Sequence, residues 1–203
     1  MIKAILLDFD GVLTTDKTGS KSIINYLSSK TGIPYNTLKA AYASFNKDLL
    51  YNGLKHEDMW QSFCDRVGTD IEYTLLTESF WNTPINNDMI ALVKRLKADY
   101  TIGMITDNKC DRIDAIVQYH GWDKLFDIIA VSAAYGSGKT DARIFTETLS
   151  ALGIRPEESV FIDNTEKNLI IPEQLGMHTI LFDDANRNIA QFTEQLHRVL
   201  NES

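Results

Sequence analysis

Short apolar segments alternate with amphipathic helices through most of the chain, and this alternation restricts the possible folds more than any other feature. The predicted strands cover residues 2–7, 100–105, 127–131, 160–162 and 178–182. The predicted helices that follow the strands cover residues 88–97, 111–119, 142–152, 166–175 and 189–200. Strands that alternate with helices form parallel sheets with right-handed crossovers. The sequence therefore predicts an α/β protein built on a parallel sheet.

A long stretch between the first and second strands has no strand pattern. Residues 14–84 instead predict helices around 22–29, 35–50, 57–67 and 72–80, separated by glycine- and proline-containing breaks. A chain of 203 residues can hold one compact α/β domain and a modest insertion. We therefore expect a core made of residues 1–13 and 85–203, and a helical insertion made of residues 14–84.

Composition narrows the range of partners. The net charge of −8 argues against sequence-independent binding to nucleic acid or anionic lipid. No apolar stretch approaches membrane-spanning length, and the run from Ala4 to Leu7 is too short for a signal peptide. The two cysteines, Cys64 and Cys110, lie far apart and are expected to be reduced thiols. These features predict a soluble, cytoplasmic protein with no membrane partner.

Polar side chains follow the predicted strands at the points where the strands end. Ligands of open parallel sheets bind at the carboxyl ends of the strands, so we expect these side chains to form one site. They are Asp8 and Asp10 after the first strand, Thr106 and Asp107 after the second, Lys139 at some distance after the third, and Asp163 after the fourth.

Two carboxylates in the string Asp8-Phe9-Asp10-Gly11 suggest phosphoryl chemistry. A carboxylate can attack phosphorus and form an aspartyl phosphate. Because a carboxylate and a phosphate repel each other, such a site needs cations, which a magnesium ion and Lys139 could supply. A hydroxyl group such as that of Thr106 could orient the phosphate oxygens.

Four segments, DFDGVLT, GMITDN, GKTDARIF and VFIDNTEKNLIIPEQLGM, resemble the four ordered motifs of the haloacid dehalogenase superfamily. The resemblance implies a three-layer Rossmann-like core with a helical cap of the first cap type, at residues 14–84. It implies a Mg²⁺-dependent phosphatase acting on a small phosphorylated metabolite, such as a sugar phosphate or a nucleoside monophosphate.

The resemblance also implies roles for individual residues. Asp8 resembles the nucleophile and Asp10 the general acid and base, and the presence of Asp10 favours phosphoryl transfer over dehalogenation. Thr106, Asp107 and Lys139 resemble substrate-binding residues, and Thr106 and Lys139 are also implied in catalysis. The implied metal site comprises Asp8, Asp10, Asp163 and Asn164.

The chain departs from the family pattern in three motifs. Thr106 is followed by an aspartate where the family usually has asparagine, and Lys139 lacks the usual neighbouring prolines. In the fourth motif, Asp163 is followed by Asn164 where many members have a second acid. Since an amide oxygen can bind magnesium but carries no charge, we expect weakened metal affinity. Whether Asp163 or Asn164 binds the ion directly is left open.

Alternative functions fit parts of the sequence. Residues 133–140, AAYGSGKT, nearly match the phosphate-binding loop of nucleotide triphosphatases, but alanine replaces the first glycine and DFDG is left unexplained. A phosphomutase would share Asp8 and Asp10. A receiver-like module would be shorter and carry its phospho-acceptor after the third strand.

Other polar residues are expected to have roles outside the chemistry of the site. His56 is expected to be solvated in the first turn of a helix, and Asp183-Asp184 to form a polar loop. For Asn168, support of the site loop and capping of its own helix are equally compatible with the sequence.

Overall fold

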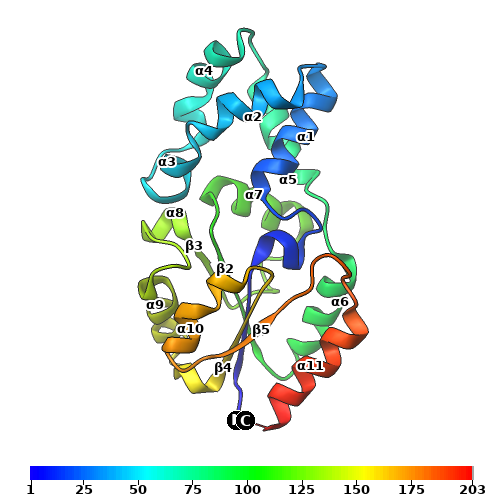
Figure 1. Ribbon diagram of the computed structural model, residues 1–203, viewed down its shortest axis with the longest axis vertical. Helices are drawn as coiled ribbons and strands as arrows, with labels where there is room; N and C mark the ends of the chain where they lie inside the picture. The colour runs from blue at the N-terminus through cyan, green and yellow to red at the C-terminus, as the bar shows by residue number, and fades with distance from the viewer. Residues whose placement is uncertain (203) are drawn as a thin grey trace.

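The computed structural model describes residues 1–202 and contains a five-stranded parallel sheet flanked by helices (Figure 1). The strand order is β3-β2-β1-β4-β5. The strands are β1 (Ala4–Leu7), β2 (Thr101–Thr106), β3 (Ile128–Val131), β4 (Ser159–Asp163) and β5 (His178–Leu181). The predicted α/β fold is confirmed. Because β1 lies in the centre, the residues that follow it emerge at the middle of the sheet edge.

Alternation of side chains along β1 explains the three layers. Ala4 and Leu6 face one side, where they pack in the same apolar cluster as helices α9 (Ala142–Leu152) and η3–α10 (Glu166–Asn168 and Ile170–Gln174). Ile5 and Leu7 face the other side. That side is covered by α6 (Asn87–Leu96), α7 (Cys110–His120) and α11 (Ile189–Glu202). Apolar residues cover both faces of the central strand, as is typical of parallel sheets.

The helix predicted at residues 166–175 is two short elements. A 3₁₀ turn covers Glu166–Asn168, and α10 then runs over Ile170–Gln174. Pro172 lies in the first turn of α10, where its missing N–H breaks no intrahelical hydrogen bond. The helix therefore restarts just before the proline. Two further short elements are α8 (Ser132–Tyr135) and a 3₁₀ turn at Pro156–Glu158.

The helical insertion lies beyond the carboxyl ends of the strands, at the top of Figure 1. The predicted helix at 35–50 is two helices, because one helix ends at Ala43 and a new helix begins at Asn46. The insertion contains α1 (Gly19–Thr31), α2 (Tyr35–Ala43), α3 (Asn46–Tyr51), α4 (His56–Val67) and α5 (Tyr73–Trp81).

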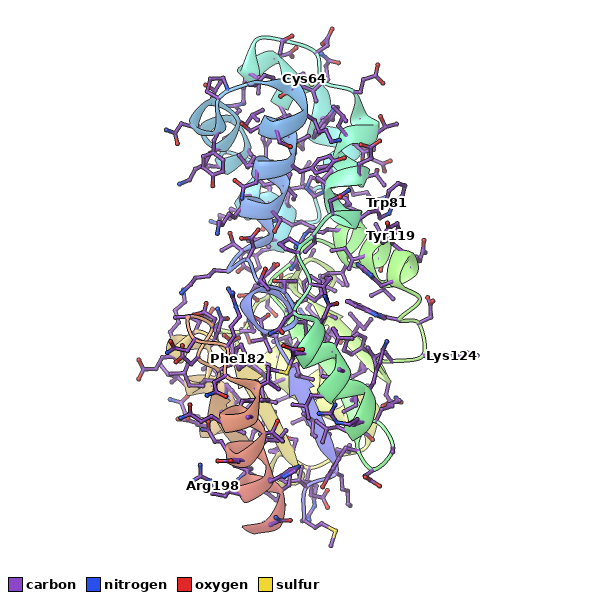
Figure 2. All side chains as sticks on the ribbon, turned by 90° about the vertical axis from the view of Figure 1, so that its right-hand side faces the viewer. Cys64, Trp81, Tyr119, Lys124, Phe182 and Arg198 are labelled. Carbon is purple, nitrogen blue, oxygen red and sulfur yellow. The ribbon has the colours of Figure 1, made fainter. Side chains whose placement is uncertain are left out.

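The chain enters and leaves the helical insertion through two adjacent segments. Thr14 and Ile85 form an isolated antiparallel bridge. The N–H of Thr15 donates to the carbonyl oxygen of Pro84 at 2.8 Å, and the N–H of Asn86 donates to that of Leu13 at 2.9 Å. A second connection is lateral, where the ring of Trp81 stacks on that of Tyr119, with centroids 5.5 Å apart (Figure 2).

Within residues 1–202, no helix combines the length and the apolar character needed to cross a membrane.

Candidate active site

A tight turn of five residues, Phe9–Leu13, follows β1 and fixes the first two carboxylates. The N–H of Asp8 still donates to the carbonyl oxygen of Ile162 in β4, at 2.8 Å. Gly11 has φ +87°, and a Cβ at this position would lie 2.3 Å from the side-chain nitrogen of Asn164. The turn therefore needs glycine both for its backbone conformation and for the close approach of the fourth motif.

Lys139 lies between two carboxylates. Its Nζ is 2.8 Å from Oδ1 of Asp8 and 2.6 Å from Oδ2 of Asp163, and the residue is only 2% exposed. Burial alone would lower the pKa of Lys139, but the charges of Asp8 and Asp163 raise it above its ordinary value. Lys139 is therefore a permanently charged ammonium group beside Asp8.

Asp8 has an unusual protonation equilibrium. Burial raises the pKa of its carboxyl group to about 7, despite the opposing charge of Lys139, and the charge of Asp163 adds to the increase. The charge of Lys139 therefore does not offset the cost of burying the Asp8 carboxylate. A further cation next to Asp8 would favour its ionised, nucleophilic form.

Asp107 joins the loops after β2 and β3. Its Oδ1 accepts the backbone N–H of Lys139 at 3.0 Å. A Cβ at Gly138 would lie 2.5 Å from the same oxygen, so glycine permits the contact. Thr106 is buried at the end of β2, with its hydroxyl oxygen 3.3 Å from Nδ2 of Asn108. The second motif therefore both lines the site and positions the lysine loop.

Asp10 is held by a buried arginine that the sequence analysis did not identify. The two terminal nitrogens of Arg112 each donate to one carboxylate oxygen of Asp10, at 2.9 Å. Nδ2 of Asn108 donates to Oδ2 of Asp10 at 2.8 Å. Arg112 is 0% exposed. One feature of the sequence could have identified Arg112. It lies four residues before Ile116, which places a charged side chain on the apolar face of α7.

The fourth motif contributes Asp163 from the end of β4. Its Oδ1 accepts from the N–H of Thr165 at 2.7 Å, and its Oδ2 accepts from Lys139. Nδ2 of Asn168 lies within 3.2 Å of both oxygens, so Asn168 supports the site loop. Both oxygens of Asp163 are therefore already occupied by donors from the protein.

Asn164 has an acidic neighbour from the loop after β5. Its Nδ2 donates to Oδ2 of Asp184 at 2.9 Å, and Asp184 is 7% exposed. Asp184 lies in a loop, as predicted, but its contact with the fourth motif was missed. A carboxylate that accepts from the amide nitrogen leaves the amide oxygen of Asn164 available for another partner.

These residues share one cavity of about 430 Å³ at the carboxyl edge of the sheet, facing the helical insertion. Of the seven predicted site residues, Asp163 is not in its lining and lies fully buried behind Lys139. Those that line the cavity are Asp8, Asp10, Thr106, Asp107, Lys139 and Asn164.

The prediction that His56 is solvated is wrong. His56 is 0% exposed, because the first turn of α4 packs against α2 and α7. Its Nε2 lies 2.7 Å from the hydroxyl of Tyr42, and its Nδ1 lies 2.6 Å from Oδ2 of Asp111. Histidine therefore bridges the helical insertion and the core.

The available ligands suit a hard cation. Within residues 1–202, no three side chains of Asp, Glu, His or Cys form a metal-binding group. Asp8, Asp10 and Asn164 line the cavity and carry side-chain oxygens, and Gly11 brings Asn164 against the turn that carries Asp10. Oxygen donors of mixed type, completed by water, are the ligands that magnesium accepts. The residues present therefore fit a magnesium site of low ligand charge.

The chain is similar to several known proteins. The family model described as haloacid dehalogenase-like hydrolase matches residues 2–176. The chain is 24% identical to GMP/IMP nucleotidase YrfG of Escherichia coli over 99% of its length and 92% of the relative's. It is 23% identical to a glyceraldehyde 3-phosphate phosphatase of Methanopyrus kandleri, over 89% and 83% of the two lengths.

Two further similarities differ in extent. A 60-residue stretch is 40% identical to the mouse acyl-CoA dehydrogenase family member 10, but it spans only 6% of that protein. Among solved structures, the enzyme bt-2542 of Bacteroides thetaiotaomicron, an Asp12Ala mutant in complex with magnesium and inorganic phosphate, superimposes with a TM-score of 0.71. That match has 16% identity and covers 91% of this chain and 96% of the other.

Proposed function

Because the chain belongs to the haloacid dehalogenase-like hydrolase family, we propose that it hydrolyses phosphate monoesters through an aspartyl phosphate on Asp8. The observation that carries this proposal is the ammonium group of Lys139, 2.8 Å from the Asp8 carboxylate, in a cavity that also contains Asp10 and Thr106. A cation this close lowers the repulsion between the attacking carboxylate and the phosphate.

The first step forms a bond between a carboxylate oxygen of Asp8 and phosphorus while the ester P–O bond breaks. Asp10 gives a proton to the departing alkoxide, which leaves as an alcohol. In the second step, Asp10 takes a proton from the water that attacks phosphorus, and Asp8 is released as a carboxylate. Thr106 donates its hydroxyl to a phosphate oxygen, and Lys139 balances negative charge in both steps.

Arg112 and Asn108 orient Asp10 for this exchange. Three hydrogen bonds fix both oxygens of the carboxylate. Proton transfer requires the acid or base to lie within hydrogen-bond distance of its partner. A fixed position therefore helps Asp10 to contact the leaving oxygen in the first step and water in the second.

Magnesium is the proposed cofactor. Asp8, the Asp10 carbonyl and Asn164 would hold it, with Asp163 and Asp184 as acids behind them. The ion would supply charge for the phosphate oxygens. Asp163 acts through Lys139, since its own oxygens already accept donors.

Residues 14–84 are proposed to act as a cap over a core of residues 1–13 and 85–203. The adjacent segments around Thr14 and Ile85 form the hinge. A closed cap would exclude bulk water during phosphoryl transfer. The phosphate-binding-loop alternative has no support here, because the Lys139 ammonium is engaged by Asp8 and Asp163.

Asp184 is expected to control magnesium affinity through Asn164. Asp184→Ala should weaken magnesium binding by about 10- to 100-fold, as expected for loss of a residue that orients a ligand. Asn164→Asp should give little gain, because the new carboxylate would face Asp184 at 2.9 Å. The double variant Asn164→Asp, Asp184→Asn should bind more tightly than wild type. Calorimetric titration of each variant with magnesium measures these affinities.

The matched control for this experiment is Glu166→Ala, which removes an exposed acid two residues after Asn164. Its affinity should equal that of wild type. Equal magnesium affinities for Asp184→Ala and wild type would show that Asp184 does not control magnesium binding. Saturation of wild type at micromolar magnesium would contradict the expected weak affinity.

The direct test of the function is a panel of phosphorylated metabolites, assayed with and without magnesium. Sugar phosphates and nucleoside monophosphates are the two classes to include, since the relatives carry names of both kinds: a nucleotidase and a triose phosphate phosphatase. Magnesium-dependent phosphate release from at least one compound is expected. Release from ATP alone would favour a nucleotide triphosphatase.

A further inference from the structure

Lys109 is a buried lysine next to the active-site residues, and the proposed reaction does not use it. It is 5% exposed and directly precedes α7. Its Nζ donates to Oδ1 of Asn46 at 2.9 Å and lies 3.4 Å from Oγ of Ser20. Ser20 and Asn46 belong to two different helices of the insertion, so the ammonium group reaches from the core into the insertion.

Within residues 1–202, no carboxylate forms an ion pair with Lys109. Burial, reinforced by the charge of Arg112, lowers the pKa of Lys109 to about 8, although Asp10 and Asp111 oppose the change. A buried ammonium group without an anionic partner is costly for the fold. An anion that arrives with the substrate would remove this cost.

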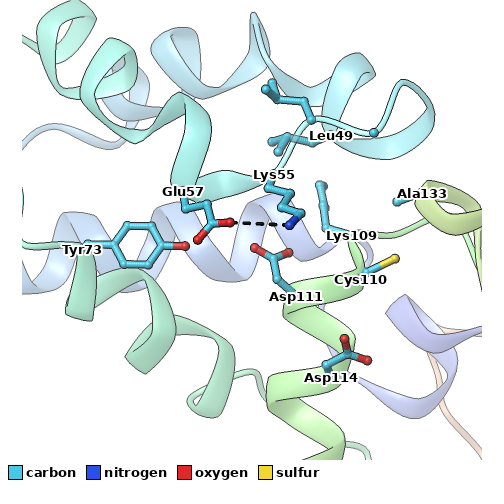
Figure 3. A pocket seen from close by; sticks show the side chains of 11 residues that line it. Leu49, Lys55, Glu57, Tyr73, Lys109, Cys110, Asp111, Asp114 and Ala133 are labelled. Atoms are coloured by element: carbon cyan, nitrogen blue, oxygen red, sulfur yellow. Dashed lines mark ion pairs between the residues drawn. The ribbon is translucent and has the colours of Figure 1, made fainter.

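Lys109 lies between two hollows of similar size. One is the cavity of about 430 Å³ that contains Asp8 and Lys139. The other, of about 410 Å³, is shown in Figure 3, and its walls carry the acids Glu57, Asp111 and Asp114. The hollow in Figure 3 has three acids and two lysines in its walls, Lys55 and Lys109, whereas the active-site cavity has three acids and four lysines. An anion that contacts Lys109 is therefore favoured on the side of the cavity that holds the nucleophile.

The insertion side of the active-site cavity contains no acid. Its residues are Lys17, Thr18, Gly19, Ser20, Asn46 and Leu50. No aromatic side chain lines the cavity itself. Tyr35 and Tyr42 line a neighbouring hollow of about 400 Å³ that shares Lys17, Thr18, Ser20 and Asn46 with it. The insertion wall is therefore polar, and its lysine, Lys17, already pairs with Asp184 at 3.0 Å. Lys109 is the cation that an anionic leaving group would meet beside this wall.

We propose that Lys109, Ser20 and Asn46 form a subsite for an anionic oxygen group, a carboxylate or a second phosphate, on the leaving group of the substrate. The proposal rests on the phosphatase function above and narrows its substrate class. The substrate is a small phosphate ester with two anionic ends. One end is the phosphate at Asp8, and the other contacts Lys109.

The test uses three-carbon phosphate esters that differ only at the far end: 3-hydroxypropyl phosphate, 3-phosphonooxypropanoate and propane-1,3-diol bisphosphate. Wild type should hydrolyse one of the two anionic esters with a kcat/KM about 10- to 100-fold above that of the neutral ester, the range for a hydrogen bond to a charged group. Whichever anionic ester is hydrolysed faster shows whether the subsite binds a carboxylate or a phosphate.

Three variants assign the preference to the residue. Lys109→Met should abolish the preference, so that kcat/KM for the anionic esters falls to that for 3-hydroxypropyl phosphate, and should unfold at a temperature no lower than wild type. Lys109→Arg should retain part of the preference. The matched control, Lys167→Met, removes an exposed lysine of the same cavity and should leave the preference intact.

Three results would overturn the inference. They are equal kcat/KM for the three esters, faster hydrolysis of GMP than of either anionic ester, and a Lys109→Met variant that is destabilised and slowed equally on all three. Failure of wild type to hydrolyse any of these compounds or p-nitrophenyl phosphate would overturn the phosphatase function itself, and the subsite with it.

Discussion

Asp8→Asn is expected to reduce kcat by at least about ten-thousand-fold, the scale seen when a catalytic nucleophile is removed. The amide cannot attack phosphorus, and no other carboxylate takes its place, since Asp10 is fixed by Arg112 and Asp163 lies behind Lys139. Steady-state hydrolysis of p-nitrophenyl phosphate with magnesium measures the loss.

The controls for this variant separate chemistry from folding. Asp8→Asn should unfold at a temperature similar to wild type, because it removes one buried negative charge and keeps the shape of the side chain. Glu166→Gln, which changes an exposed acid near the fourth motif, should keep full activity. Near-normal turnover by Asp8→Asn would reject Asp8 as the nucleophile.

Arg112→Met is expected to lower the free energy of unfolding by about 3–5 kcal/mol, the cost of removing one partner of a buried ion pair. The variant leaves the Asp10 carboxylate, 8% exposed, without its cation. Adding Asp10→Asn should return part of the loss, since the uncompensated charge disappears. Chemical denaturation of wild type, both single variants and the double variant yields the coupling free energy.

The control for this cycle is Arg95→Met, at an exposed position of α6. It should change the free energy of unfolding by no more than about 0.5 kcal/mol, as is usual for surface substitutions. If Arg112→Met were as stable as Arg95→Met, the contact between Arg112 and Asp10 would make no measurable contribution to the free energy of unfolding.

The sheet could be predicted from the sequence because each strand has a short apolar run that ends at a polar residue. The strand ends also placed Asp8, Asp10, Thr106 and Lys139 at one edge, since parallel strands share a direction. The helix boundaries could not be predicted as well as the strands. The helix expected at 35–50 is divided between Ala43 and Asn46.

The buried polar contacts could not be predicted in the same way. Arg112, His56 and Asp184 are ordinary surface residue types, and each is buried by a partner distant in the chain. Arg112 pairs with a residue 102 positions away. Local periodicity shows which face of a helix points inward, but it does not show which charged side chain finds a partner there.

The central claim is that Asp8 carries the phosphoryl group, and trapping that group tests the claim most directly. In the Asp10→Asn variant, p-nitrophenyl phosphate needs no proton for its leaving group, so the first step proceeds, while the second step stalls without a base. Acid quenching and peptide mass spectrometry then locate the phosphoryl group. We expect a burst of about one nitrophenolate per protein molecule, and a phosphorylated peptide modified at Asp8. Steady nitrophenolate release with no burst and no modified Asp8 would contradict the account.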